Sequence, residues 1–370
     1  MYIHKLPAWT NFIWDQKRLS TLLADIRNRQ GRLLGRMESL GFALQNEAAL
    51  ETLSMEVVKT SEIEGEILDL AMVRSSIARR MGFEVAGVET TDRNIEGIVE
   101  MMLDATRNFD LPLTSERLFA WHAALFPTGR SGMKKIMVGD WRTGKNGPMQ
   151  VVSGPIGKEK VHFEAPKAEL IPDEMRSFLD WFNQDEDEDP VIKAAIAHLW
   201  FVTIHPFEDG NGRIARAIAE MQLAKADQMA RRFYSMSSQI QQEKKTYYDM
   251  LEKTQKGTHD ISNWMEWFLL CLGHSLSAAE TTIGRAVEKS RIWEHIRTKK
   301  INDRQHLMIN KLIDGFEGKL NTSKWAKITK CSPDTALRDI QNLINQEILE
   351  KEPAGGRSTG YILKRLQTPN

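Results

Sequence analysis

The stretch HPFEDGNGRIAR, residues 205–216, lies between two segments whose apolar residues recur with helical spacing. The segment before it, PVIKAAIAHLWFVTI over 190–204, starts at a proline that follows Asp189, a residue type that caps helices. Helical spacing resumes at Asn211 and continues to about Ala226. We therefore predict two helices joined by a tight loop.

The loop and the start of the second helix combine features that bind anions. Gly210 and Gly212 let the backbone approach a ligand closely, and the amides of a helix that begins at Asn211 favour negative charge. Arg213 and Arg216 are three residues apart, so they share one helical face, from which both guanidinium groups can bind phosphate oxygens. The pattern predicts a phosphate site.

Two further residues of the stretch add chemistry to that site. His205 ends the first helix, and an imidazole with the ordinary pKa of about 6.5 can accept a proton from a hydroxyl near neutral pH. Asp209 directly precedes the glycines, where a carboxylate can bind Mg²⁺. Each feature alone also has a structural explanation as a turn or a packed residue, but their combination favours a catalytic site.

Two other ligand sites fit the sequence less well. Asp209, Asn211 and Glu220 occupy the first, third and twelfth positions of a calcium loop, but arginine holds the fifth and isoleucine replaces the required glycine. GDWRTGKN over 139–146 approaches a Walker A loop, yet it ends in asparagine where Ser or Thr is needed, and Gly-Pro follows it. Metalloprotease, α/β-hydrolase and protein-kinase signatures are absent from the sequence.

Length and composition set wider bounds. The 370 residues suffice for several domains, and the 50 basic and 50 acidic residues cancel, so no overall field attracts nucleic acid or an anionic membrane. The two cysteines, Cys271 and Cys331, form no Cys-x-x-Cys pair, which argues against a disulfide framework or a cysteine-based zinc site. Without a signal-peptide pattern or a membrane-length apolar run, we expect a soluble, cytoplasmic protein.

Helical spacing dominates the chain outside this stretch. We predict an N-terminal helical region over 1–90 and a core over 91–285. Within the core, TSERLFAWHAALF over 114–126 is typical of a capped helix, with His122 packed on its apolar stripe. Glycine and proline recur over 133–166, where MQVVS and KVHFE flank GPIGKE as the strands of a β-hairpin.

The stretch resembles the motif of the Fic family, which is His-Pro-Phe, any residue, Asp or Glu, Gly-Asn-Gly-Arg, two residues and Arg. Every fixed position matches, and the similarity extends from about Asn94 to Leu276. GDWR resembles a segment before the family's flap, VVSGPIGKEKVHFEAP resembles the flap hairpin, and YYDML resembles a helix beside the nucleotide. The resemblance implies an all-α fold, a helical bundle with one β-hairpin flap, and a target protein that docks on the flap at about 149–166.

Fic proteins typically transfer AMP from ATP to a hydroxyl side chain of a target protein and release pyrophosphate. On this resemblance, His205 would deprotonate the Ser, Thr or Tyr of the target, and Asp209 would hold Mg²⁺ between the α- and β-phosphates. The backbone of Gly210, Asn211 and Gly212 would bind the α-phosphate.

The resemblance also implies the rest of the nucleotide site. Arg213 and Arg216 would bind the outer phosphates, and Tyr247, Tyr248 and Leu251 would line the adenine or ribose, although adjacent tyrosines on a helix are as often packing residues. ATP is the expected co-substrate and Mg²⁺ the expected cofactor, and self-modification is an expected side reaction.

TSEIEG, residues 60–65, resembles the family's inhibitory motif, which is Ser or Thr, three residues, Glu, and then Gly or Asn. Thr60, Glu64 and Gly65 match it, and the resemblance implies that Glu64 pairs with Arg216, the arginine needed for the γ-phosphate. An ordinary helix end is the alternative, because glycine commonly follows a last helical turn. In some relatives the same glutamate helps to remove AMP from modified targets, and the sequence leaves this reverse activity open.

The ends of the chain are less informative. Residues 291–370 contain a helix, a turn, a second helix and a Gly-rich hairpin, an order typical of a winged helix that binds either DNA, through 305–364, or protein. Residue types that contact bases recur there: Asp334, Arg338, Gln341, Asn342 and Arg357. The first sixty residues resemble an extension of some Fic proteins, and the aromatic residues of LPAWTNFIWD suit packing on the core or on a second copy in a homodimer.

Two classes of function therefore remain. One is a protein adenylyltransferase that inhibits itself, and the other is a DNA-binding regulator whose Fic core senses a nucleotide or a target. Within the enzyme class, transfer of a different nucleotide or phosphate group stays open, because the motif specifies a diphosphate and leaves the base weakly specified.

Overall fold

A computed structural model describes residues 1–82, 92–155, 157–184, 188–313, 316, 318–352 and 359–364, and at 146, 285, 286 and 288–290 it describes the backbone alone. The chain divides into two compact units, residues 1–279 and 280–370. Helix α11 (Ser262–Ile296) begins in the first unit and ends in the second. Within the described residues, no helix is both long and apolar enough to cross a membrane.

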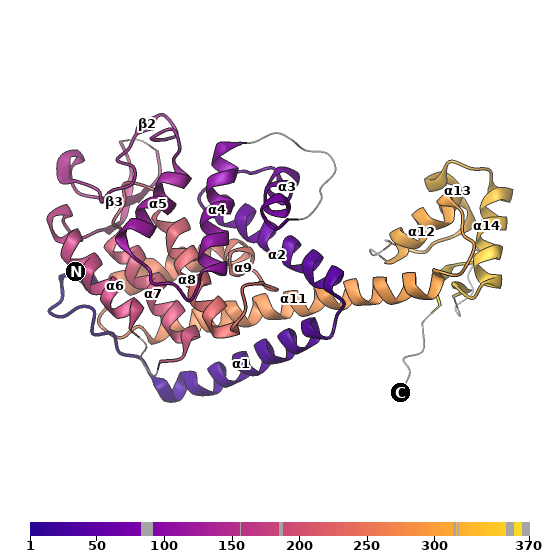
Figure 1. Cartoon of the computed structure of the whole chain (residues 1–370), viewed down its shortest axis with the longest axis horizontal. Coiled ribbons are helices and arrows are strands. Elements are labelled where there is room, and N and C mark those ends of the chain that lie inside the picture. The colour runs from indigo at the N-terminus through magenta and orange to yellow at the C-terminus, as the bar shows by residue number, and fades with distance from the viewer. Residues whose placement is uncertain are drawn as a thin grey trace. The chain divides into compact units, whose positions relative to one another are not determined.

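The first unit is mostly helical (Figure 1). Besides α11 it contains α1 (Gln16–Glu38), α2 (Phe42–Ile63), α3 (Leu70–Arg80), α4 (Arg93–Arg107), α5 (Ser115–Leu125), α6 (Ile171–Asn183), α7 (Pro190–Ile204), α8 (Asn211–Asp227), α9 (Met236–Gln242) and α10 (Lys244–Gln255). Short 3-10 turns lie at Ile3–Lys5, Gly144–Asn146 and Ala168–Leu170.

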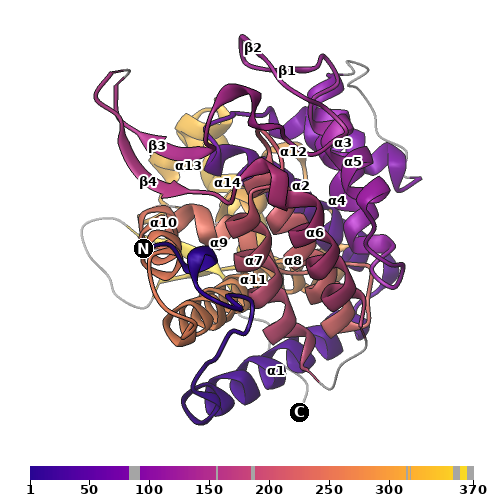
Figure 2. The same cartoon turned by 90° about the vertical axis from the view of Figure 1, so that its left-hand side faces the viewer.

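Helices α7 and α8 form the centre of this unit, as Figure 2 shows. The sequence prediction for both is confirmed, since α7 spans the predicted 190–204 and α8 begins at Asn211. Asp189 caps α7 by accepting a hydrogen bond from the Val191 amide, 2.8 Å away. Every residue of α7 after Pro190 is buried, because α6, α8 and α11 cover it. The loop between the two helices is thereby held on a rigid base.

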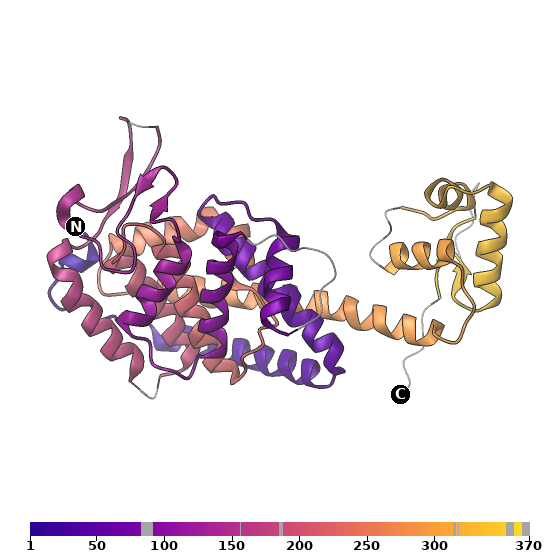
Figure 3. The same cartoon turned by 45° about the horizontal axis from the view of Figure 1, so that its top comes forward.

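The β structure differs from the sequence prediction. The expected hairpin is present as β3 (Gln150–Ser153) and β4 (Lys160–Glu164), which pair antiparallel. The prediction of one hairpin in the core was wrong, because β1 (Arg130–Ser131) and β2 (Lys134–Lys135) form a second one. Gly132 has φ of +54° in the connecting turn, a conformation that glycine adopts at little cost. Figure 3 shows both hairpins on the same side of the helical bundle.

The N-terminal aromatic residues pack on the chain's own core. Trp9 is buried, its indole N–H donates to the Glu174 carboxylate at 3.2 Å, and its ring meets those of Phe12 and Trp200 edge-on. His122, on α5, is also packed as predicted and is fully buried.

The second unit has its own apolar core. It contains α12 (Asp303–Ile313), α13 (Thr322–Thr329), α14 (Pro333–Asn345), β5 (Leu349–Lys351) and β6 (Tyr361–Leu363), and the two strands pair antiparallel. Trp325 is fully buried at its centre. Arg304 on α12 and Asp339 on α14 form an ion pair at 2.7 Å that joins the two helices. Arg357 lies outside the described residues.

The close packing of α4 on α5 requires a glycine at position 97. A Cβ at Gly97 would lie 1.8 Å from the carbonyl oxygen of Ala124, so Gly97→Ala forces the two helices apart. We expect a loss of about 3 kcal/mol of stability, read from urea unfolding followed by circular dichroism. Gly35→Ala on α1 is the matched control, because nothing lies within 4 Å of its added methyl. That variant should gain roughly 0.5–1 kcal/mol, and equal midpoints for the two variants would contradict the packing argument.

Candidate active site

The loop between α7 and α8 is shaped by its own side chains and strained backbone. Asn211 closes it, because its Oδ1 accepts from the Phe207 amide and its Nδ2 donates to the Phe207 carbonyl, both at 2.9 Å. Gly210 has φ of +81°, and a Cβ there would lie 2.9 Å from the ring of Phe126. The Asn211 side chain is thus committed to the loop, and the amides that begin α8 are left to face a ligand.

His205 lies at the end of α7 in the left-handed conformation, with φ of +53°. Its Nδ1 faces the Val202 carbonyl at 3.2 Å, a contact that requires the N–H on Nδ1 and leaves the lone pair on Nε2. Burial lowers the pKa of His205 to about 4, only partly opposed by the Val202 contact and by Asp209. The imidazole is therefore neutral throughout the physiological range, whereas an unperturbed imidazole has a pKa of about 6.5.

Asp209 is positioned by the small hairpin and by α5. Its carboxylate accepts hydrogen bonds from the hydroxyl of Ser131 and from the Gly210 amide. Its backbone carbonyl meets Nε2 of His122 at 3.2 Å, and Nδ1 of the same ring accepts from the Gly139 amide, also at 3.2 Å. Burial lowers the pKa of His122 to about 4, so this ring is neutral and can serve as a fixed donor to the loop.

Asp209 suits a cation that takes most of its ligands from a substrate. Within the described residues no three His, Cys, Asp or Glu side chains cluster as a metal site. Mg²⁺ is commonly held by one or two carboxylates together with substrate phosphates, so a single aspartate beside an anion-binding helix start fits it. Glu220 takes no part, because it is buried and pairs with Arg232 at 2.9 Å, which supports the rejection of a calcium loop.

Both arginines of α8 are buried and face the end of α2 and the segment that follows it. Arg216 donates through Nε to the Thr60 hydroxyl at 2.7 Å, and through Nη2 to the Thr60 carbonyl at 2.9 Å and to Glu64 Oε1 at 2.7 Å. Arg213 donates through Nη1 to Glu66 Oε2 at 2.7 Å. Burial opposes the charge of Arg216, but Glu64, together with Tyr247 and Tyr248, outweighs this and raises its pKa.

Two donors of these arginines stay unused. Within the described part of the chain, Nε of Arg213 and Nη1 of Arg216 are buried without a hydrogen-bond partner. Native proteins rarely leave buried charged donors unsatisfied, because each costs roughly 1–3 kcal/mol. The arrangement is therefore suited to an anionic ligand that brings its own oxygen atoms.

Glu64 approaches the start of α8 closely. A Cβ on Gly212 would lie 2.2 Å from Glu64 Oε1, so only glycine leaves room for this carboxylate. Glu64 is also the C-cap of α2, and Gly65 follows it with φ of +88°. The segment is thus a helix end and, at the same time, places a carboxylate where the α8 N-terminus favours an anion.

A cavity of about 570 Å³ opens at this point. Tyr247, Tyr248 and Leu251 line it as expected, together with Glu64, Val151, Val152, Ser153, His162, Val202, His205, Gly212, Lys245, Asp249, Glu252 and Gln255. The Tyr247 hydroxyl is bound to Nε2 of His198 at 2.9 Å, and the residue is almost fully buried, so little of its ring is available to a ligand. Tyr248 is partly exposed and offers its ring more fully.

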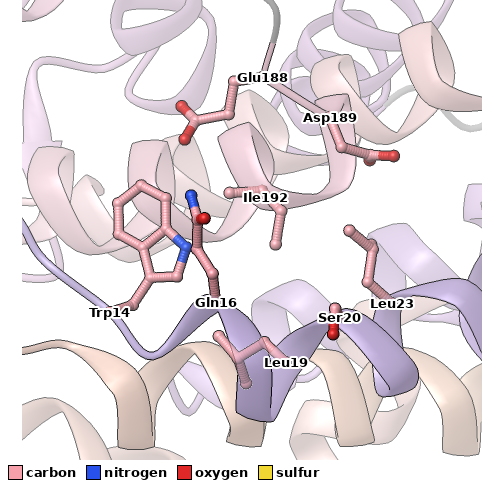
Figure 4. A pocket seen from close by; sticks show the side chains of 8 residues that line it. All are labelled: Trp14, Gln16, Leu19, Ser20, Leu23, Glu188, Asp189 and Ile192. Atoms are coloured by element: carbon pink, nitrogen blue, oxygen red, sulfur yellow. The ribbon is translucent and has the colours of Figure 1, made fainter.

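A second cavity, of about 470 Å³, lies where the segment before α1 meets the start of α7 (Figure 4). Trp14 and Gln16 line it from one side, and Glu188 and Asp189 from the other. It has no basic side chain among its lining residues, and its two carboxylates repel phosphate. Of the residues predicted from the sequence to bind a nucleotide, Gly212, Tyr247, Tyr248 and Leu251 line the first cavity, and none lines the second.

Sequence reasoning missed four residues that build this site: Phe126, Ser131, Arg142 and Glu66. Arg142, in the GDWR segment, is buried and donates to the His205 carbonyl at 2.7 Å and to the Pro166 carbonyl at 2.6 Å. It thereby connects the end of the hairpin segment to the loop. Phe126 lies under Arg213, with the guanidinium carbon 5.1 Å from its ring centre. The proximity of GDWR to the predicted flap was the only sequence signal for any of them.

Buried arginines, a glycine loop at a helix start and an adjoining hairpin define a helical domain built to hold an anion. A model described as "Fic/DOC family" matches residues 112–223, which contain this loop, and a second, "Domain of unknown function (DUF4172)", matches residues 2–83. The part of the chain that carries the loop, residues 112–223, is therefore a Fic/DOC domain. Residues 60–65, which resemble the family's inhibitory motif, lie within the second match.

Two proteins of known name are similar to this chain in sequence. "Protein adenylyltransferase fic-1" of Caenorhabditis briggsae is 28% identical over 56% of this chain and 37% of its own length. "Protein adenylyltransferase Fic" of Nematostella vectensis is 24% identical over 64% of this chain and 51% of its own length. The chain thus spans about half or less of the length of these relatives.

Two solved structures share the fold. A Fic family protein from Desulfovibrio desulfuricans G20 aligns over 94% of this chain and 97% of its own, with a TM-score of 0.52 and 20% identity. A Fic domain-containing signaling protein from Bacteroides thetaiotaomicron VPI-5482 aligns over 70% and 97%, with a TM-score of 0.52 and 21% identity.

The buried histidines predict how stability depends on pH. The folded-state pKa values of His122 and His205 are about 4, below the value of about 6.5 expected in the unfolded chain. The unfolded state therefore binds more protons between these values, and stability is complete above pH 6.5 and is lost as the pH falls toward 4. Each histidine should cost about 2 kcal/mol at pH 5.

Urea unfolding at pH 7, 6 and 5 measures this loss. His122→Phe removes one titrating group. The number of protons taken up on unfolding sets the slope of the unfolding free energy against pH, and it should fall by up to one between pH 4 and 6.5. An unchanged slope in this variant would show that His122 is protonated in the folded protein.

Proposed function

We propose that this protein transfers AMP from ATP to a Ser, Thr or Tyr hydroxyl of a target protein and that Glu64 holds it inactive. The observation that carries the proposal is the pair of buried arginines, Arg213 and Arg216, which leave charged donors unused beside the start of α8. Phosphate oxygens would satisfy these donors, and the amides of Gly210, Asn211 and Gly212 would bind the α-phosphate as the family resemblance implies.

The transfer step follows from the positions of two residues. The acceptor oxygen forms a bond to the α-phosphorus, the bond from that phosphorus to the bridging oxygen breaks, and pyrophosphate leaves. The acceptor proton goes to Nε2 of His205, which is neutral and has its lone pair free. Asp209 would hold Mg²⁺, which neutralises phosphate charge during the transfer. Arg142 keeps the base in place through the His205 carbonyl.

The β3–β4 hairpin is the proposed docking site for the target. A two-stranded sheet has free edges, to which an extended peptide can add as a third strand. Val152 and Val161 on this hairpin are exposed apolar side chains, at 47% and 38%, and could pack against such a peptide. Arg142 connects the hairpin segment to His205. The hydroxyl of a docked peptide would therefore lie near His205, the proposed base.

Inhibition would result from competition between carboxylate and phosphate. Glu64 Oε1 is bound to Arg216 and lies against Gly212, so it repels an anion from the helix start and occupies the arginine that the γ-phosphate needs. Removal of AMP from modified targets, with Glu64 positioning water, rests on the same contact. Transfer of another nucleotide is the alternative, because the motif specifies a diphosphate and leaves the base weakly specified.

For the second unit we propose a winged helix, from the order α12, α13, α14 and the β5–β6 hairpin. Arg338 and Gln341 are exposed on α14, whereas Asn342 accepts a hydrogen bond from Gln305 at 3.0 Å. DNA binding by this unit remains a prediction, as does homodimer formation.

Glu64→Gly is the direct test of this function. The purified variant is incubated with Mg²⁺, each of the four α-labelled nucleoside triphosphates in turn and a whole-cell protein extract, and label on protein is measured. We expect label from ATP to rise at least about 100-fold over the parent chain, because the carboxylate that occupies Arg216 is removed. His205→Ala in the same background should remove the label from the extract proteins. If neither the extract nor the chain is labelled, the proposed function is wrong.

Glu66 predicts a second, weaker restraint. It pairs with Arg213, but it is 47% exposed, so solvent screens the pair. Glu66→Ala should therefore raise ATP affinity by only about threefold, measured by calorimetry in the Glu64→Gly background. Glu62→Gln is the control, because Glu62 lies near Glu66 in the chain, in the last turn of α2, and pairs with Lys59 instead. Equal changes in the two variants would rule out a specific role for Glu66.

A further inference from the structure

Three side chains of the cavity form a hydrogen-bonded chain that the steps above do not use. Ser153 ends β3, His162 lies on β4, and Glu252 lies on α10. The Ser153 hydroxyl is 2.6 Å from Nε2 of His162, and Nδ1 of the same ring is 2.5 Å from Glu252 Oε2. The chain thus links a hydroxyl, an imidazole and a carboxylate in the order used to activate serine nucleophiles.

The direction of these hydrogen bonds is set by Glu252. A carboxylate only accepts, so Nδ1 of His162 carries the N–H, and Nε2 of the neutral ring is left to accept from the Ser153 hydroxyl. Lys256 donates to the other oxygen of Glu252 at 2.6 Å. Hydrogen bonds from Lys256 and then His162 lower the pKa of Glu252 to about 2, so it stays charged at neutral pH. The imidazole is therefore oriented to take the serine proton.

The same three residues lie beside the proposed phosphate site. Ser153, His162 and Glu252 line the one cavity that Gly212, Glu64 and His205 also line. Ser153 is exposed and belongs to a strand end, where it pairs with Lys160. An electrophilic phosphorus bound at the start of α8 would thus share its cavity with an oriented serine.

We propose that Ser153 is a self-modification site that accepts a nucleoside monophosphate from the triphosphate bound in its own cavity. This inference rests on the proposed function, which supplies the triphosphate. The Ser153 oxygen forms a bond to the α-phosphorus, the bond from that phosphorus to the bridging oxygen breaks, pyrophosphate leaves, and the serine proton passes to Nε2 of His162. Glu252 balances the imidazolium that results.

Modification would also change the hairpin that the target is proposed to use. The new phosphodiester adds a negative charge and a nucleoside at the end of β3, inside the cavity that must take the next triphosphate. Self-modification of Ser153 therefore opposes further transfer and limits the activity released when Glu64 is displaced.

The test uses the full chain carrying Glu64→Gly, with Mg²⁺, ATP and the same cell extract, followed by peptide mass spectrometry. We expect a gain of one AMP on the peptide that contains Ser153, and none at that peptide in Ser153→Ala. His162→Gln keeps a side chain that can hydrogen-bond but removes the base, so the Ser153 signal should fall about 100-fold relative to other modified sites in the same sample. Ser177→Ala on α6, an exposed serine bound to the Asp173 carbonyl, is the control for substitution of a serine.

The outcomes separate this inference from the proposed function. AMP on extract proteins or on other residues, with none on Ser153, overturns the self-modification site and leaves the proposed function standing. A Ser153 signal that His162→Gln does not reduce overturns the role of the imidazole as proton acceptor. No AMP on any protein overturns the proposed function and this inference together. Melting curves of the variants confirm that the exposed substitutions leave the fold intact.

Discussion

Arg216 is a buried cation, and the surrounding fold is arranged to satisfy it. A charge removed from water costs several kcal/mol unless hydrogen bonds and an opposite charge compensate it. Three hydrogen bonds to Arg216 come from the last turn of α2 and its C-cap, two at Thr60 and one at Glu64. That turn is fixed in its place because Glu56, one turn before Thr60, accepts hydrogen bonds from Ser235 and from the Ser237 amide, 3.0 Å away. The helix that carries the carboxylate is thus held to the domain that it would inhibit.

The central helices and the motif could be predicted from the sequence because their signals are local. The apolar run that becomes α7, its capping Asp189 and the glycines that precede Arg213 all lie within thirty residues. The β3–β4 hairpin was found for the same reason, from two short apolar runs around a turn. Contacts between distant segments could not be predicted in this way. Arg213 and Glu66 are 147 positions apart, and no local pattern pairs them.

The pKa of His205 is a second property that could not be predicted from the sequence. Its place at a helix end was predicted, but the amount of protein around it was not, and burial is the main cause of its lowered pKa. The hairpin β1–β2 was missed because two strands of two residues carry no alternation that a sequence pattern could detect. In both cases the missing information is the position of segments that pack on the motif from elsewhere in the chain.

The loop itself leaves little room for movement, which places any regulation outside α8. Asn211, Arg142 and His122 each bind its backbone, and the left-handed conformation of His205 is held against a strain of order 1–3 kcal/mol. By contrast, the side chains of Glu64 and Glu66 are 31% and 47% exposed. Water already reaches these carboxylates, so their release costs less than movement of the buried arginines. Any signal that activates the site would therefore act on the turn around Gly65 and leave α7 and α8 where they are.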